Sequence, residues 1–248
     1  MRVAAVYDIH SNLPALEAVL QDIRQAKVDC IVVGGDVFPG PMPRETIKCL
    51  LDLDIPVQFI QGNCDREVLE CMRGTETSSV PEEVRDIMRW AAQQLYPEYE
   101  SLIASWPKTL RIQVSGLGDV LFCHATPRSD IEVFTRLTPE DRLLPIFKEV
   151  DVPVVVCGHT HMQFNRTIGS MRILNAGSVG MPYGEPGAYW LLLGPDVQLR
   201  HTDYDLAKAA ERIRNTEYPQ AHDFAASNVQ QPPSEEEALK AFTPLELR

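Results

Sequence analysis

The first 63 residues alternate strand-like and helix-like segments, and this alternation limits the fold more than any other feature of the chain. Residues 2–7, 29–36 and 56–63 contain short apolar runs that are typical of buried strands. Between them, the segment that starts at Asn12 and residues 43–53 place their apolar side chains on one face, as helices do. This order is typical of parallel strands joined by right-handed crossovers, so we expect an α/β protein.

The second half of the chain is richer in strands. Strand-like runs flank the turn sequences SGLG and Gly169-Ser170, which predicts two hairpins, and residues 188–203 add a last strand pair. The run DVPVVVCGH is continuously apolar and predicts a central strand that is buried on both faces. We therefore expect two mixed β-sheets packed face to face, with helices outside.

Two segments fall outside this strand pattern. The sequence of residues 66–106 predicts two or three helices. We leave open whether this helical insert is a cap over a site, a dimer face or part of the outer helical layer. After a predicted helix at 205–214, the polar composition of residues 216–248 indicates a loosely packed C-terminal tail. The predicted domain thus covers residues 1–215.

Side chains of metal-binding type follow the strand-like runs at five separated points of the chain. They are Asp8, His10, Asp36, Asn63, His124, His159 and His161. Because α/β sheets place their sites at the carboxyl ends of the strands, we expect these side chains to converge. They are enough for two metal ions, and a pair of metal ions serves hydrolytic chemistry, most often at phosphorus. Nitrogen and oxygen ligands without thiolate favour Mn, Fe, Ni, Co or Zn over Ca or Cu(I).

The local spacing of these residues suggests how they share a pocket. Asp8 and His10 are two residues apart, as are His159 and His161, and in extended backbone that spacing puts both side chains on one face. Asp36 follows two glycines, which let the backbone approach a metal and free the carboxylate to reach two ions.

The motifs DIH, GGD, GNCD, the histidine of CHA, and GHTH occur in the order that is typical of one family. In this order the chain resembles the calcineurin-like metallophosphoesterase superfamily, and the later NAGSVGMP resembles its small bacterial and archaeal phosphodiesterase branch. The resemblance covers residues 1–205 and implies a metallophosphoesterase-like αββα sandwich.

The resemblance also implies a binuclear centre of two divalent transition metal ions, for which we choose manganese. One ion would be held by Asp8, His10, Asp36 and His161, and the other by Asp36, Asn63, His124 and His159. Asp36 would bridge the two ions, and a metal-bridging hydroxide would attack phosphorus. Asp36, Asn63 and His124 are accordingly the predicted catalytic residues.

Three further residues lie near these motifs, and two of them, Asn12 and Asp65, have two interpretations. Asn12 and Cys64 are candidates for substrate binding, but Asn12 is equally suited to cap the helix that follows it. Much of the superfamily has histidine where this chain has Cys64, and a thiol with a pKa of about 8.5 is a poor proton donor to a leaving group. Asp65 either caps a helix or supports the site.

Composition limits the kinds of molecule that the protein can be expected to bind. The net charge of −12 and the pI of about 4.9 disfavour duplex nucleic acid, whose binding depends on Lys and Arg, and favour a small phosphorylated substrate. We find neither a signal peptide nor a membrane span, and the six cysteines form no CxxC pair. We therefore expect a cytoplasmic protein with reduced thiols, and leave open whether it is a homo-oligomer.

The predicted function is that of a metal-dependent hydrolase of phosphoesters, with small phosphodiesters preferred. A phosphomonoesterase or phosphatase is the first alternative, although the first arginine after GGD is Arg44 and GNCD replaces the GNH that phosphoprotein phosphatases carry. A nuclease lacks support in length and charge. A scaffold with the same fold and no turnover is the alternative from another class, and the intact ligand set disfavours it.

Overall fold

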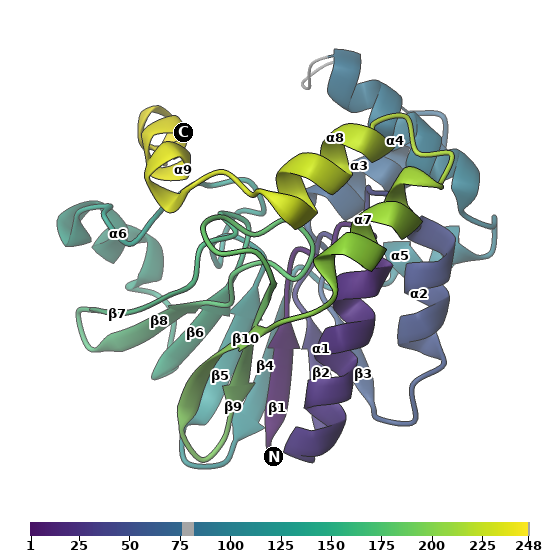
Figure 1. The fold of residues 1–248 in the computed structure, drawn as a ribbon. Coiled ribbons are helices and arrows are strands. Elements are labelled where there is room, and N and C mark those ends of the chain that lie inside the picture. The colour runs from purple at the N-terminus through teal and green to yellow at the C-terminus, as the bar shows by residue number, and fades with distance from the viewer. Residues whose placement is uncertain (76–81, 248) are drawn as a thin grey trace.

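A computed structural model describes residues 1–75 and 82–247 of the protein. Its centre is a pair of five-stranded sheets with helices outside them, so the predicted α/β sandwich is confirmed (Figure 1). The first sheet has the strand order β10-β9-β1-β2-β3. Its strands are β1 (Val3–Val6), β2 (Cys30–Val33), β3 (Val57–Phe59), β9 (Ala188–Leu193) and β10 (Val197–Thr202).

The second sheet has the order β4-β5-β6-β8-β7. Its strands are β4 (Thr109–Val114), β5 (Gly118–Cys123), β6 (Val154–Cys157), β7 (Phe164–Ile168) and β8 (Met171–Asn175). As predicted, β1 and β2 are parallel, β2 and β3 are parallel, and β6 is central. The three expected hairpins, β4–β5, β7–β8 and β9–β10, are antiparallel.

The alternation of side chains along β1 joins the layers of the sandwich. Ala4 and Val6 belong to the core beneath helices α1 (Leu13–Ala26) and α2 (Pro43–Leu51), whereas Ala5 and Tyr7 belong to the core between the two sheets. The Tyr7 hydroxyl crosses this second core and donates to the carbonyl oxygen of Val156 in β6, 3.2 Å away. Both sheets therefore hold the carboxyl end of β1 in place.

The expected helices of 66–106 are α3 (Asn63–Met72), α4 (Glu82–Gln94) and α5 (Tyr99–Ala104). Residues 76–81, within the segment predicted to be helical, lie outside the described residues. Helix α6 (Glu140–Phe147) covers the outer face of the second sheet and was not predicted from the sequence. Among the described residues, we find no helix of the length and apolarity that a membrane crossing requires.

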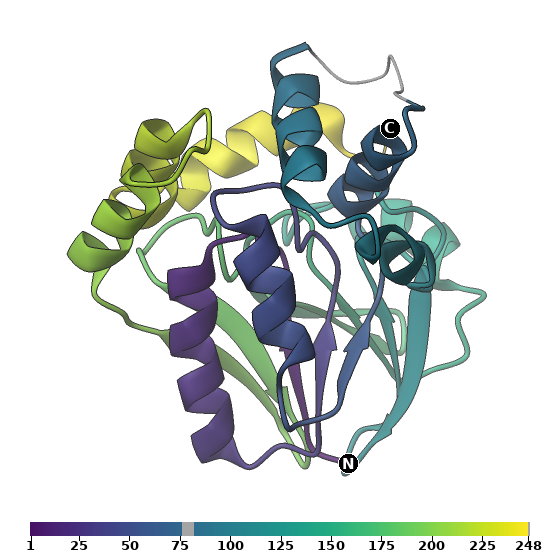
Figure 2. The same cartoon turned by 90° about the vertical axis from the view of Figure 1, so that its right-hand side faces the viewer.

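The C-terminal segment corrects the predicted loose tail. Helix α7 (Leu206–Arg214) matches the helix predicted at 205–214. The segment after it contains α8 (Ala221–Phe224), a π-helical turn η1 (Ala225–Gln230), α9 (Glu235–Phe242) and a short η2 (Thr243–Leu245). Tyr218, Phe224 and Val229 are buried in the core that α1 and α2 cover, and the Tyr218 ring lies 5.1 Å from that of Trp90 in α4. An apolar stripe at helical spacing within this polar segment explains the difference. The helices lie over one end of the sandwich (Figures 1 and 2).

Candidate metal centre

All seven predicted ligands converge at the carboxyl ends of the strands. Asp8 and His10 follow β1, and Asp36 follows β2, while Asn63 opens α3 after β3. On the second sheet, His124 follows β5, and both His159 and His161 follow β6. Each of the seven side chains is buried or half-buried.

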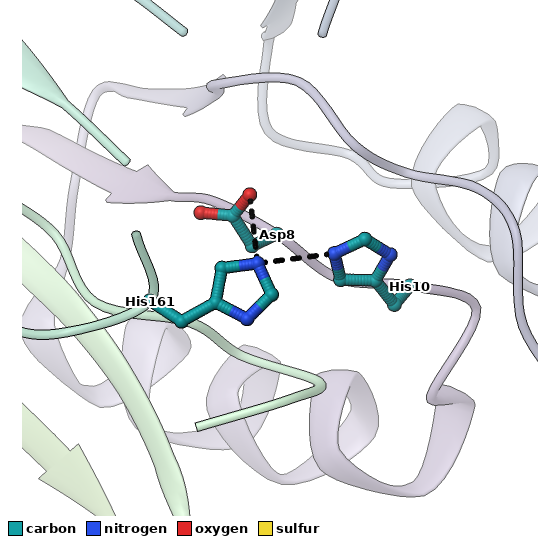
Figure 3. Close-up of side chains that lie close together, drawn as sticks. All are labelled: Asp8, His10 and His161. Carbon is teal, nitrogen blue, oxygen red and sulfur yellow. Dashed lines mark hydrogen bonds and ion pairs between the residues drawn. The ribbon is translucent and has the colours of Figure 1, made fainter. Parts of the chain in front are cut away.

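One group of ligand atoms is formed by Asp8, His10 and His161, all within 4.8 Å of one another. Nε2 of His161 lies 3.4 Å from Oδ1 of Asp8 and 3.3 Å from Nε2 of His10 (Figure 3). His10 and His161 are 151 positions apart in the chain, and they follow strands β1 and β6 of different sheets. The group therefore lies where the two sheets meet.

A second group is formed by Asp36, His124 and His159, also within 4.8 Å. Nε2 of His124 lies 3.4 Å from Oδ2 of Asp36 and 3.1 Å from Oδ1 of Asn63. The same Oδ2 lies 3.9 Å from Nε2 of His10 in the first group. Asp36 therefore stands between the two groups.

The backbone brings these side chains together in a way that differs from the extended geometry we expected. Asp8 and His10 have φ values of 51° and 45°, and His159 and His161 have 66° and 57°. Asp36, at 52°, is in the same left-handed region. This conformation costs an ordinary residue about 1 kcal/mol or more, and such strain is concentrated at functional sites in proteins. The prediction that the pairs share a face in extended backbone was wrong.

Two glycines of the motifs leave space for ligands from other motifs. A Cβ atom at Gly62 would lie 2.2 Å from Oδ1 of Asp36, and one at Gly158 would lie 2.5 Å from Oδ2 of Asp8. Real Cβ contacts are not this short. Any larger residue before Asn63 or His159 would therefore displace a carboxylate of the opposite motif.

Asp65 fixes the loop that carries Asp36. Its buried carboxylate accepts hydrogen bonds from the backbone N–H groups of Asp36 (2.8 Å), Val37 (2.9 Å), Phe38 (3.2 Å) and Gly62 (3.0 Å). Burial and the neighbouring Asp36 charge raise the pKa of Asp65 to about 7, although the hydrogen bonds from the backbone lower it. Of the two interpretations of Asp65, support of the site fits the structure, and one of its four bonds also serves the start of α3.

Two of the histidines have a fixed orientation. Nδ1 of His124 donates to the carbonyl oxygen of Gly34 (2.9 Å), and Nδ1 of His161 donates to that of Met181 (2.7 Å). In each ring the remaining Nε2 points into the cluster. Metal-binding histidines in proteins usually have this second hydrogen bond, which fixes the ring and leaves one nitrogen for the ion.

Two observations indicate that the cluster fits cations. Oδ1 of Asp8 is buried and accepts no well-aligned hydrogen bond among residues 1–75 and 82–247; beside its contact with Nε2 of His161 at 3.4 Å, a nearby cation would stabilise this carboxylate. The Asn63 amide fits two orientations, and with Nδ2 inward it donates to Nε2 of His124 and Nδ1 of His159, each 3.1 Å away. With Oδ1 inward, the Asn63 oxygen faces the ring nitrogens of His124 and His159. These three acceptors repel one another unless they share a cation or a proton.

The protonation of the histidines without ions follows from the same contacts. Burial alone lowers the pKa of His124, but the charges of Asp36 and Asp8 outweigh burial and raise this pKa to about 10. Burial lowers the pKa of His10 and that of His159 to about 4, helped by neighbouring histidines. A cation would therefore have to displace a proton from His124.

The structure contradicts a phosphate contact for Asn12. Its side chain is fully buried; Oδ1 accepts from the backbone N–H of Ala15 and Nδ2 donates to the carbonyl oxygen of Gly180, 2.9 Å away. Asn12 is thus a helix cap that also ties α1 to the loop after β8. Cys64 is half-buried and forms, with His10 and Asp36, a third group of atoms within 4.8 Å.

Sequence reasoning missed several residues around the cluster. The Tyr183 ring lies 5.9 Å from the ring of His161 and the same distance from Phe242 in α9. Lys108 and Arg128 line a hollow beside His124. None of them belongs to a motif or has a distinctive spacing, so only the folded chain reveals them.

An αββα sandwich whose strand ends present a carboxylate between two groups of histidine and carboxylate ligands has the metallophosphoesterase architecture. A family model described as the calcineurin-like phosphoesterase superfamily domain matches residues 1–194. The chain belongs to this superfamily.

Individual relatives agree with this assignment. A metallophosphoesterase from Sphaerobacter thermophilus is 26% identical, with a TM-score of 0.68 over 92% of this chain and 99% of its own. Hypothetical protein PH1004 from Pyrococcus horikoshii OT3 has a TM-score of 0.78 over 94% and 99% of the two chains, and at 18% identity the likeness is one of fold. Phosphodiesterase YfcE of Escherichia coli K12 is 25% identical over 202 residues, 77% of this chain and 87% of YfcE.

Proposed function

We propose that the protein is a two-metal phosphoesterase that prefers small phosphodiesters. The observation that carries the proposal is the position of Asp36 between two groups of ligand atoms, one with Asp8, His10 and His161 and the other with His124 and His159. Asn63 completes the second group.

The residues fit two divalent ions of Mn, Fe, Ni, Co or Zn type, because the inward atoms are carboxylate oxygens, imidazole nitrogens and an amide oxygen. Such ions, when bound, supply Lewis acidity toward phosphoryl oxygens and lower the pKa of an attacking water. The protein's own contribution is positioning. Hydrogen bonds to Gly34 and Met181 orient His124 and His161, and Asp65 holds the loop of Asp36.

Preference for a diester is supported by what surrounds the cluster. Phosphatases grip a phosphate dianion with an arginine near the GD motif, but here Arg44 donates to the carbonyl oxygen of Gln94 and stacks on the Tyr96 ring, 4.3 Å away. A monoester dianion therefore lacks this charge partner. YfcE, the relative from Escherichia coli, carries the name phosphodiesterase.

Cys64 sets an expectation about leaving groups. Since a thiol replaces the histidine that is common at this position, the protein lacks one strong proton donor beside Asp36. Substrates with acidic leaving alcohols, such as p-nitrophenol, should react fastest. Cys64→His should raise the rate with poor leaving groups, and an unchanged rate would mean that another group donates the proton.

The test compares bis(p-nitrophenyl) phosphate with p-nitrophenyl phosphate, using metal-stripped protein titrated with Mn²⁺. We expect Mn²⁺-dependent hydrolysis with a larger kcat/KM for the diester. A larger kcat/KM for the monoester would favour a phosphatase. Absence of turnover in protein shown by calorimetry to bind two ions would contradict the proposal and favour a scaffold.

A further inference from the structure

An apolar cavity opens beside the metal-ligand cluster on the side of His10. Its volume is about 280 Å³, and His10 and Cys64 line it together with residues of α4, of the loop after β8 and of the C-terminal segment. We call it the apolar chamber. Its walls are formed by Val84, Ile87, Met88, Met181, Tyr218 and Phe224.

A second hollow lies on the side of His124 and has a more polar lining. Its volume is about 160 Å³, and Lys108, Arg128 and several hydroxyl groups line it. We call it the polar recess. The proposed metal centre therefore has one apolar and one polar neighbour, and a diester has two groups on phosphorus that must lie in different directions.

We propose that the apolar chamber binds an aromatic ring carried by one ester group of the phosphate substrate. The inference rests on the proposed function, because His10 links the chamber to the ligand cluster. An apolar cavity of about 150 Å³ holds a benzene ring, so the chamber is large enough for a substituted or fused ring. The substrate class is thus narrowed to phosphoesters with an aromatic or heteroaromatic group.

The side chains of the chamber suit a ring better than a flexible chain. Met88 and Met181 supply polarizable sulfur, which makes favourable contacts with aromatic rings, and Tyr218 and Phe224 supply aromatic faces and edges. The exposed polar residues Gln220 and Ser227 border the same cavity and offer hydrogen bonds to the polar edge of a heterocycle.

The C-terminal segment packs against α4 and forms one side of the chamber. Val84 and Ile87 are only half-buried, so part of each side chain remains accessible beside Tyr218 and Phe224, which are nearly fully buried. The segment anchors two aromatic rings, and its packing leaves a space between itself and α4. The polar recess offers no comparable apolar wall.

The test measures binding of two phosphonates that differ in one group. Benzylphosphonate and methylphosphonate are titrated calorimetrically into the full-length, Mn²⁺-loaded protein, so turnover is not needed. We expect benzylphosphonate to bind about ten- to a hundredfold more tightly, which is the usual gain from burying a ring of this size. Equal affinities would overturn the inference even if the protein hydrolyses diesters.

Matched variants locate the ring. Val84→Trp fills the chamber and Ile87→Asn makes its wall polar, and either change should reduce the preference for benzylphosphonate to less than about threefold, since the gain from burial is lost. Ile131→Asn makes the same exchange at the polar recess and should leave the preference intact. Loss of preference in Ile131→Asn, with Val84→Trp unaffected, would place the ring in the recess and contradict the proposal.

The two proposals fail in distinguishable ways. Ring-selective phosphonate binding without any diester hydrolysis would contradict the phosphodiesterase and leave the chamber as an aromatic subsite. Diester hydrolysis without ring selectivity would contradict the chamber and leave the catalytic assignment intact.

Discussion

The ligand cluster and its surroundings are built on different principles. The seven ligands follow the ends of adjacent strands, and backbone bonds such as His10 N–H to the carbonyl oxygen of Asp36 (3.0 Å) tie their loops together. The apolar chamber instead combines side chains of α4 with those of residues 218–228, which no strand connects. The cluster depends on short motifs and the chamber on long-range packing. Chemistry and selectivity are therefore separable by mutation.

The sharpest test of this separation is Asp36→Asn. Because Asp36 stands between both ligand groups, we expect kcat/KM for bis(p-nitrophenyl) phosphate to fall by about a thousandfold or more, in keeping with several kcal/mol of metal-dependent stabilisation. The matched change Asp130→Asn removes a carboxylate that pairs with Arg66 (2.8 Å) at the border of the polar recess, and it should cost less than about tenfold. Similar losses in both variants would contradict the assignment of Asp36.

The next test concerns Gly158. Its replacement by alanine puts a methyl group 2.5 Å from both Oδ2 of Asp8 and Cδ1 of Tyr7. This overpacking of about 1–3 kcal/mol should lower thermal stability and, where Asp8 moves, lower the Mn²⁺ affinity by up to about a hundredfold. Calorimetry measures the affinity. Gly74→Ala is the control, because its Cβ meets no atom within 4 Å. Its φ of 69° strains an alanine by about 1 kcal/mol, so it should lower thermal stability and leave the affinity unaltered.

The protonation of the cluster predicts a pH dependence. Without ions the pKa of His124 is about 10, so His124 carries a proton at neutral pH that a metal must displace. Metal binding should release protons, and the apparent affinity for Mn²⁺ should rise with pH from 6 to 8 by up to about tenfold per unit for each proton displaced. Titrations in buffers of different ionisation enthalpy measure the release. Binding without proton release would contradict a protonated His124 in the ion-free protein.

The smallest effect is expected at the polar recess. Lys108 is exposed, so Lys108→Ala should raise KM for a phosphodiester by less than about fivefold, as is usual for solvent-screened charges, and should leave Mn²⁺ affinity unchanged. Steady-state kinetics at two salt concentrations measure the effect. A loss as large as that of Asp36→Asn would mean that the recess takes part in catalysis.

The same contrast explains what could be predicted from the sequence. The order of strands and helices up to Asn63 follows from periodicity, and the ligand motifs follow the strands because strand ends meet at one edge of a sheet. The left-handed backbone at Asp8 and His10 could not be predicted, since ordinary residues avoid it and tertiary bonds impose it.

Residues whose role depends on distant partners were predicted least well. Asn12 was predicted to contact substrate or to cap the helix, and the structure shows the cap, with a further bond to Gly180 that the sequence did not indicate. Tyr218 and Phe224 lie in a segment whose polar composition concealed an apolar stripe. Their burial depends on α4 and on the core beneath it, and no local pattern in the sequence reveals that contact.

The space at Gly62 and Gly158 has a consequence for how the chain tolerates change. Each glycine makes room for a carboxylate that belongs to another motif, so the motifs are interdependent: a substitution at one glycine would be accommodated only if a carboxylate 26 or 150 positions away moved with it. The effects of mutations in different motifs should therefore be non-additive in double-mutant cycles. Substitutions should therefore accumulate in the residues that line the hollows beside the cluster. Such substitutions can change the substrate while the metal-binding motifs stay together unchanged.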